Sequence, residues 1–237
     1  MFGVVAERAV PLAVMLREVP RSLATLSAEH ADGWGVAVRD GGTWTIEKSV
    51  AQAARCPKFE AVCAVRAQVA VAHVRKKTVG ETALENTHPF RRGTFVFAHN
   101  GTADSGWLAA RSSPERLAEI EGATDSERLF AFVMTHIDEV GAVGAGVARA
   151  ALALRSEPAV GSVNFLLSDG ASLHAFRLGR SLYVLRRGGG GCRRAKALAV
   201  ASEPLSAEAW TEVEQGSLVT LAIDATSPAT SAVAHPA

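Results

Sequence analysis

The sequence contains little cysteine, few aromatic residues and no excess of charge of either sign. Its three cysteines form no Cys-x-x-Cys pair, which argues against a disulfide framework and against a zinc site of recognisable spacing. The 25 Lys and Arg residues nearly balance the 24 Asp and Glu residues, so the chain lacks the basic excess typical of proteins that bind nucleic acid. A sparse, odd number of cysteines is typical of a reducing compartment, and we expect a cytoplasmic location.

Long apolar runs and internal repeats are also missing. No stretch approaches the ~20 apolar residues of a membrane-spanning helix, so we expect no membrane association. Glu7 and Arg8 interrupt the apolar start before the core of a signal peptide could form. Without repeats or a long linker, the sequence predicts a single domain over residues 1–225. The remaining segment, residues 226–237, is rich in Ser, Thr, Ala and Pro, and we expect it to be a frayed tail.

Two series of short β-rich runs flank a central group of helix-forming segments. Strands are expected over Trp34–Val38, Thr43–Lys48, Val69–Val74 and Thr94–Ala98, and then over Val163–Leu167, Leu173–Arg177, Leu182–Leu185, Leu198–Ala201 and Leu218–Ile223. Helices are expected over Val10–Val19 and Gly144–Leu154, and also from Ser22 to Glu29, from Ser113 to about Glu121, and from Asp125 through Ile137. This order predicts an α+β protein in which helices cover two antiparallel sheets.

Polar residues gather at the expected strand ends and turns. The segment 30–35 (HADGWG) is an Asp-Gly turn that leads into a strand, and a tight turn is its simplest interpretation. Arg75 ends a strand, where its guanidinium could bind a carboxylate through two parallel hydrogen bonds, although a solvated basic edge is the commoner fate. His88, which precedes Pro89, is either part of a binding site or a structural histidine.

Two further segments are equally ambiguous when taken alone. Asn100-Gly101 is either a hairpin turn or a pair of N–H donors that could stabilise an oxyanion. Asp125, in the segment 124–127 (TDSE), is either part of a helix cap or a carboxylate that could hold an ammonium group.

Taken together and in this order, these segments resemble the class II glutamine amidotransferases of the N-terminal-nucleophile hydrolase superfamily, in particular their short stand-alone members. The resemblance covers nearly the whole chain. It begins with the strand at Phe2 and includes the later blocks 164–170 (NFLLSDG) and 201–205 (ASEPL). It implies a four-layer αββα sandwich of two antiparallel sheets, with the active site at one edge of the sheets where the first strand begins.

The resemblance also implies roles for individual residues. Asn100 and the Gly101 N–H match the oxyanion hole, Arg75 the residue that binds the α-carboxylate of the substrate, and Asp125 the residue that binds its α-amino group. Thr78 and His88 are expected among the substrate-binding residues, and Leu26, Trp34 and Trp107 are candidates for the walls. In the family an N-terminal cysteine attacks the γ-carboxamide of glutamine, its own α-amino group acts as the base, and water then hydrolyses the thioester. No metal or organic cofactor is implied.

The sequence departs from the family at this nucleophile. The usual opening is Met-Cys-Arg followed by a hydrophobic residue, whereas this chain begins Met1-Phe2-Gly3. One explanation is a start placed two codons late, with Met1 in the position that follows Cys-Arg. The other is a genuine loss of the nucleophile. We favour the first, because the residues expected to contact substrate are all present, and we expect the printed chain to be inactive.

The expected function is therefore that of a hydrolase that cleaves the γ-amide of glutamine or of a γ-glutamyl compound. The alternative is a catalytically inactive relative that acts as a glutamine-binding or partner-binding domain. The expected partners are the small-molecule substrate and an ammonia-accepting protein, and no nucleic acid is expected.

Overall fold

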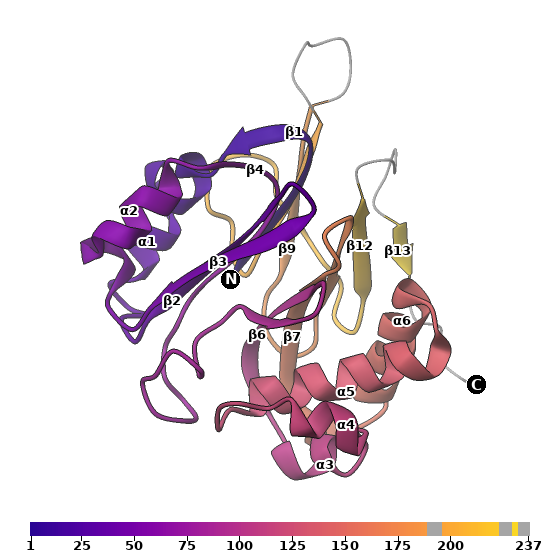
Figure 1. Ribbon diagram of the computed structural model, residues 1–237. Coiled ribbons are helices and arrows are strands. Elements are labelled where there is room, and N and C mark those ends of the chain that lie inside the picture. The colour runs from indigo at the N-terminus through magenta and orange to yellow at the C-terminus, as the bar shows by residue number, and fades with distance from the viewer. Residues whose placement is uncertain (189–195, 223–228, 232–237) are drawn as a thin grey trace.

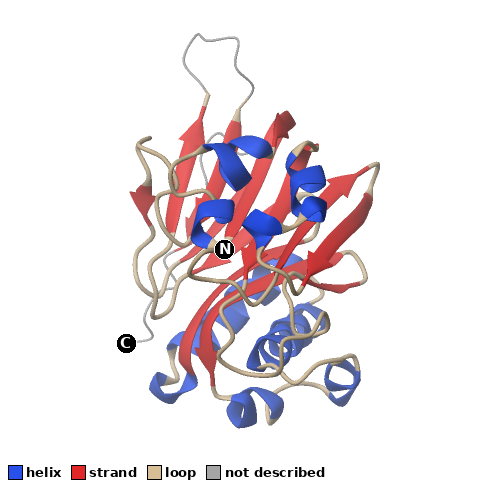
Figure 2. Ribbon diagram, turned by 90° about the vertical axis from the view of Figure 1, so that its left-hand side faces the viewer, coloured by secondary structure: helices blue, strands red, loops and turns tan. Residues whose placement is uncertain are grey.

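Two antiparallel β-sheets are stacked on one another and carry helices on their outer faces (Figure 1). This computed structural model describes residues 1–188, 196–222 and 229–231. Figure 2 shows the same layers from the side, with one group of helices beside each sheet. The four-layer αββα arrangement expected from the sequence is confirmed.

The first sheet has seven strands in the order β11-β9-β10-β1-β4-β2-β3. Its strands are β1 (Phe2–Pro11), β2 (Trp34–Asp40), β3 (Thr43–Ser49), β4 (Arg66–Val74), β9 (Tyr183–Arg187), β10 (Ala197–Ala201) and β11 (Thr211–Glu212). Strand β1 is central, and it runs antiparallel to both of its neighbours, so that Phe2 pairs with Ala201 of β10 and with Ala72 of β4. The start of β1 therefore lies between the ends of β10 and β4.

The second sheet has six strands in the order β13-β12-β8-β7-β6-β5. Its strands are β5 (Phe90–Arg92), β6 (Phe95–Ala103), β7 (Gly161–Ser168), β8 (Ser172–Phe176), β12 (Leu218–Ala222) and β13 (Ala229–Ser231). Strand β13 falls within the segment that we expected to form the tail, and the rest of that segment lies outside the described residues.

The helices form two groups. Those that follow strands of the first sheet are the π-helix η1 (Val14–Glu18), α1 (Leu23–Leu26), the 3-10 turn η2 (Ala53–Arg55) and α2 (Pro57–Cys63). Between the two series of strands lie α3 (Ser105–Ala109), α4 (Pro114–Ala118), α5 (Asp125–Val140), α6 (Val143–Arg155) and the 3-10 turn η3 (Pro158–Val160). In the part of the chain that the structure describes, no helix is both long enough and apolar enough to cross a lipid bilayer.

The expected helix over Val10–Val19 is wrong in its first part. Strand β1 continues to Pro11, because Val10 and Pro11 pair with β4 beyond a register shift, and only Val14–Glu18 is helical. Apolar spacing alone could not separate the two structures, because the strand pairing that holds Val10 is made with residues more than 50 positions away.

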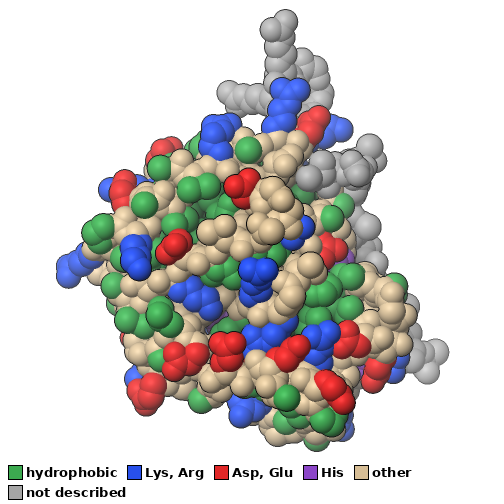
Figure 3. All heavy atoms as spheres, viewed as in Figure 1, with side chains coloured by type: hydrophobic (Ala, Val, Ile, Leu, Met, Phe, Trp, Pro, Cys, Tyr) green, Lys and Arg blue, Asp and Glu red, His purple; other side chains and the backbone are tan. Residues whose placement is uncertain are grey.

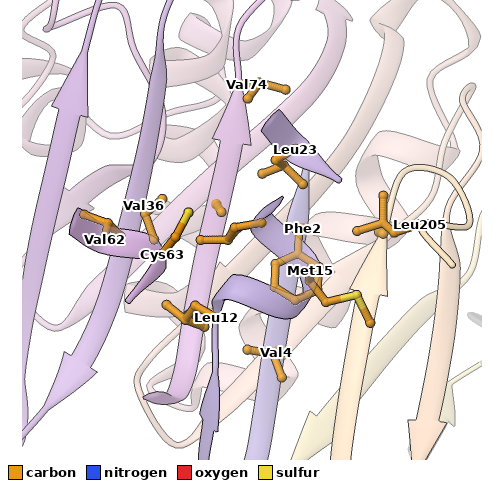
Figure 4. Packing of buried hydrophobic residues seen from close by; sticks show 14 of the residues in the cluster. Phe2, Val4, Leu12, Met15, Leu23, Val36, Val62, Cys63, Val74 and Leu205 are labelled. Carbon is orange, nitrogen blue, oxygen red and sulfur yellow. The ribbon is translucent and has the colours of Figure 1, made fainter. Parts of the chain in front are cut away.

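The core is divided into three apolar layers. One, shown in Figure 4, lies between the seven-stranded sheet and its helices, where Phe2 and Val36 pack with Met15, Leu23 and residues of α2. A second lies between the six-stranded sheet and α5 and α6. The third lies between the two sheets. Alternate residues of β1 serve the first and third layers, which is why this strand is apolar on both faces.

Candidate active site

A cavity of about 460 Å³ lies where the start of β1 meets the ends of β4 and β10. Strand β6 of the second sheet and the N-terminus of α5 complete its walls. All six residues expected at the site from the sequence line this cavity, namely Arg75, Thr78, His88, Asn100, Gly101 and Asp125. The structure thus brings together residues that lie 50 positions apart in the chain.

Asn100 and Gly101 lie within β6, paired with β7, and so do not form the hairpin turn that was their alternative interpretation. The side-chain amide of Asn100 donates a hydrogen bond to Ser202 Oγ at 3.2 Å. Gly101 is required by close packing, because a Cβ atom there would lie 1.8 Å from the carbonyl oxygen of Ser162. Gly101 itself lines the cavity.

Arg75 is buried and held by the loop that follows it. Its guanidinium donates hydrogen bonds to the carbonyl oxygens of Val79, Gly80 and Glu81 at 3.0 to 3.3 Å. A guanidinium carries five N–H groups, so two remain for a ligand in the cavity. The solvated basic edge is therefore the wrong alternative for Arg75, although Lys76 and Lys77 beside it are exposed.

Hydrogen bonds join the segment 30–35 to Arg75 and to the residues that follow it. The backbone N–H of Arg75 donates to Gly33 O at 2.7 Å, and Asp32 Oδ2 accepts from the Lys77 N–H at 2.8 Å. Gly35 must be a glycine because of close packing, since a Cβ atom there would lie 2.2 Å from the carbonyl oxygen of His88. The Asp-Gly turn thus positions the ends of two segments that line the cavity.

Asp125 is the first residue of α5, and only 4% of it is exposed. The N-cap is Thr124, whose hydroxyl accepts from the Glu127 N–H, so Asp125 is not needed as the cap. Its Oδ2 accepts from the Ala103 N–H at 2.7 Å, which joins α5 to the end of β6. The remaining carboxylate oxygen is free of hydrogen bonds within the described residues, and it can accept from an ammonium group.

Four of the seven histidines in the chain line the cavity, namely His30, His73, His88 and His99. The rings of His73 and His88 lie 4.5 Å apart, and neither nitrogen of His88 has a hydrogen-bond partner among the described residues. Burial lowers the pKa of both side chains well below the usual value of histidine, and nearby positive charges act in the same direction. Both rings are therefore neutral at pH 7.

His99 is also neutral, because burial lowers its pKa despite the nearby negative charge of Asp125. Its Nε2 lies 3.1 Å from Ser162 O, which can only accept, so Nε2 carries the proton. Its Nδ1 then accepts from Ser126 Oγ at 2.9 Å. This pair of hydrogen bonds joins β6, β7 and α5 directly beside Asn100.

The wall on the β10 side contains Ser181, Ser202 and Glu203, for which the sequence alone predicted no role. The Ser202 N–H donates to Met1 O at 3.1 Å, and Ser181 Oγ donates to Ser202 O at 2.7 Å. Glu203 forms an ion pair with Arg21 at 2.7 Å. Burial lowers the pKa of the Met1 amine to about 6, partly opposed by Glu203. The polar block 201–205 at a strand end was the available signal for this wall.

Two of the three wall residues suggested by the sequence do not reach the cavity. Leu26 lines the cavity. Trp34 is fully buried against Phe59 in the layer between the seven-stranded sheet and its helices, and Trp107 packs on Phe132 of α5. Cys56 and Cys63 also lie away from the cavity, and Cys192 is outside the described residues.

Comparison with known proteins identifies the family of this chain. Residues 1–190 match the family model described as "Glutamine amidotransferases class-II". The chain belongs to the class II glutamine amidotransferases. Among curated relatives of this class II chain, YafJ of Escherichia coli is 30% identical over 172 residues, which cover 67% of this chain and 65% of YafJ. The gamma-glutamyl-hercynylcysteine sulfoxide hydrolase of Mycobacterium tuberculosis is 32% identical over 198 residues, covering 80% of this chain and 75% of that protein.

The fold of this class II amidotransferase is that of N-terminal-nucleophile hydrolases. The glutamine phosphoribosylpyrophosphate amidotransferase of Bacillus subtilis superposes with a TM-score of 0.71 at 19% identity, over 99% of this chain and 49% of the larger enzyme. The chain spans between 59% and 65% of the length of the first curated relatives that it matches. The resemblance to this family drawn from the sequence is confirmed, as is the fold class.

Proposed function

We propose that this class II amidotransferase chain hydrolyses the γ-amide of glutamine or of a γ-glutamyl compound. The observation that carries the proposal is the convergence of Arg75, Asp125 and the pair Asn100-Gly101 on one cavity. A γ-glutamyl group ends in an α-carboxylate and an α-ammonium group, which require one cation and one anion. Its scissile carbonyl requires N–H donors where negative charge develops during attack.

The proposed roles are as follows. The two free N–H groups of Arg75 bind the α-carboxylate, with Thr78 at the same loop, and the free oxygen of Asp125 accepts from the α-ammonium group. The Asn100 amide and the Gly101 N–H stabilise the oxyanion. His88, neutral and without a partner in the described part of the chain, offers a hydrogen bond to the bound γ-glutamyl group.

The proposed nucleophile is a cysteine two residues ahead of Met1, in a Cys-Arg pair that continues β1 into the cavity. Met1 already lines this cavity beside Ser202, whereas Cys56 and Cys63 do not reach it. The α-amino group of this cysteine takes the thiol proton, the thiolate attacks the γ-carbonyl carbon, and the C–N bond breaks as the same amino group passes the proton to the departing nitrogen, which leaves as ammonia or an amine. Water then hydrolyses the thioester to glutamate and regenerates the thiol. No metal or organic cofactor enters this scheme.

Residues 1–225 are proposed to act as one domain in this reaction, and its thiol chemistry fits the reducing cytoplasm. With glutamine as the substrate, the released ammonia would pass to an ammonia-accepting partner protein. The gamma-glutamyl-hercynylcysteine sulfoxide hydrolase among the relatives supports the choice of γ-glutamyl compounds as substrates as well as glutamine.

The test compares three forms of the chain, namely the printed sequence, the same chain preceded by Cys-Arg, and a matched control preceded by Ser-Arg. After removal of any initiating methionine, glutamate release from glutamine and γ-glutamylglycine is measured. We expect turnover only in the Cys-Arg form. Turnover by the printed chain would overturn the proposed nucleophile. Glutamine binding without turnover in every form would favour the alternative, a glutamine-binding domain.

The native start is determined separately by mass spectrometry of the N-terminal peptide from the protein's own cell. A peptide that begins Cys-Arg-Met-Phe supports the hydrolase. A peptide that begins Met-Phe supports the binding domain.

A further inference from the structure

Three arginines line the cavity, and Arg21 is paired there with Glu203, while Arg75 and Arg180 lie on opposite sides of the start of β1. Arg75 follows β4, and Arg180 lies in the connection from β8 to β9, beside the wall that contains Ser181 and Ser202. Since β4 and β10 flank β1 on its two sides, the cavity has one cationic group on the β4 side and another on the β10 side. The γ-glutamyl end of a substrate accounts for Arg75 and leaves Arg180 without a function.

The backbone of Arg180 is held in place by a buried side chain. Asn164, which is fully buried in β7, donates to the carbonyl oxygens of Arg180 and Ser181 at 2.9 and 3.0 Å. Its Oδ1 accepts from the N–H groups of Leu178 and Arg180 at 2.8 and 3.3 Å. Both donors and both acceptor positions of this amide are therefore used to fix one short connection. Such an arrangement positions Arg180 at the rim with little loop freedom.

No side chain of the described residues neutralises the charge of Arg180. Its guanidinium is exposed and has no ion-pair or hydrogen-bond partner in the described part of the chain. Glu203 on the same wall is engaged by Arg21 through two hydrogen bonds of 3.0 and 2.7 Å, so this pair adds no net charge. Glu29, also on the rim, is exposed and interacts electrostatically with Arg21 and His30.

Asn100 indicates which end of a substrate Arg180 would meet. Its amide contacts Ser202, Ser202 contacts Ser181, and Ser181 follows Arg180 directly in the chain. The charge of Arg180 is also felt by His99, the neighbour of Asn100. A scissile carbonyl held at Asn100 therefore has Arg75 on the side of the glutamyl group and Arg180 on the side of the β10 wall, where the departing amine can extend.

We propose that the preferred substrate is a γ-glutamyl amide whose amine part carries an acid group, and that Arg180 binds this second acid group. The inference rests on the proposed function and deepens it. A guanidinium binds a carboxylate through paired, charge-assisted hydrogen bonds, whereas glutamine, which releases only ammonia, has no group that could reach Arg180. Arg180 is thus a specificity-determining residue, and it takes no part in bond cleavage.

Binding to the printed chain tests this without any need for turnover. Isothermal titration calorimetry is carried out with γ-glutamylglycine, with the neutral γ-glutamylglycinamide, and with glutamine. We expect γ-glutamylglycine to bind about tenfold more tightly than the glycinamide. Arg180→Gln should remove this preference and leave glutamine affinity unchanged. Arg8→Gln, which removes an exposed charge of β1 away from the cavity, is the matched control and should retain it.

The outcomes separate the two proposals. If glutamine binds but γ-glutamylglycine and its amide bind equally well, the role of Arg180 is overturned while the proposed function stands. The same follows if Arg180→Gln retains the preference. If none of the three ligands binds the wild-type chain, both proposals fail, because no γ-glutamyl site is then present.

Discussion

The side-chain amide of Asn100, on the six-stranded sheet, donates a hydrogen bond to Ser202 Oγ, at the end of β10 on the seven-stranded sheet. These residues lie 102 positions apart, and their contact joins the two sheets at the point where β1 begins. The cavity is thus a junction between sheets, and its donor geometry depends on how the sheets are stacked. Figure 1 shows this junction near the position marked N, between the two groups of helices.

Asn100→Ala should reduce catalysis in the chain preceded by Cys-Arg. We expect kcat for glutamate release to fall by about 10²- to 10³-fold with little change in KM, because the lost donor acts on the developing oxyanion. Ser202→Ala, which removes only the acceptor that orients the amide, should lower kcat less than tenfold. Equal kcat values for Asn100→Ala and the parent would contradict the oxyanion role.

Gly101→Ala should destabilise the fold strongly. Its Cβ atom would lie 1.8 Å from Ser162 O, so β6 and β7 must separate locally, and we expect a loss of about 3 kcal/mol or more in the free energy of unfolding. Gly93→Ala is the control, because φ is +56° there and no atom lies within 4 Å of the added Cβ. It should cost about 1 to 2 kcal/mol from backbone conformation alone. Urea denaturation measures both, and similar losses would refute the steric explanation.

Asn164→Ala should loosen the connection that carries Arg180 and Ser181. Four hydrogen bonds are lost and the freed backbone groups are left without partners, so we expect a loss of about 2 to 4 kcal/mol in unfolding free energy. Hydrogen exchange should also become faster over residues 178–181. Asn164→Asp keeps one acceptor oxygen but sets a second carboxylate oxygen against the carbonyl oxygens of Arg180 and Ser181, so it should cost at least as much as Asn164→Ala. Unchanged exchange in Asn164→Ala would show that other contacts hold the connection.

The stability of the protein should fall as the pH decreases below about 6.5. Burial lowers the pKa values of His73, His88 and His99 in the folded state, so the unfolded chain binds protons more readily in this range. The stabilisation from these neutral rings is fully present above the unfolded pKa of about 6.5 and is lost as the pH falls below it. Each histidine contributes at most about 1.4 kcal/mol per pH unit.

The pH prediction is checked by chemical denaturation at several pH values between 8 and 5. His88→Gln removes one buried titrating ring and should make the decline less steep. His136→Gln is a useful comparison, since His136 is also a titrating histidine with a lowered pKa but lies outside the cavity. A stability that rises on acidification from pH 7 to 5 would contradict the assignment of neutral rings.

The surface agrees with the balanced composition of the sequence. On the face shown in Figure 3, Lys and Arg side chains lie interspersed with Asp and Glu side chains over both groups of helices. This mixed face lacks the continuous basic stripe that binding to a nucleic-acid backbone requires. At the rim of the cavity, Arg21 is paired with Glu203, whereas Arg180 has no partner in the part of the chain that the structure describes.

Local sequence signals were sufficient for most of the fold. Short β-rich runs predicted β2, β3, β4 and the strands from β7 to β10, and Ser113-Pro114 and the segment 124–127 marked the starts of α4 and α5. These features depend on neighbouring residues, so they can be seen in the sequence alone. The short strands β5 and β11 and the helices α2 and α3 were not predicted, because they have too few residues to show a period.

The sequence by itself determined the residue types of the site, through Arg75, the pair Asn100-Gly101 and Asp125, and the order of the motifs determined the family. Only the tertiary structure decided which residues face one another across the cavity. It placed Ser202 beside Asn100, fixed Arg180 through Asn164, buried Trp34 in the core and packed Trp107 on Phe132. The physical reason is that these contacts arise from strand pairing and from the stacking of two sheets. Both join residues far apart in the chain, and neither leaves a local pattern in the sequence.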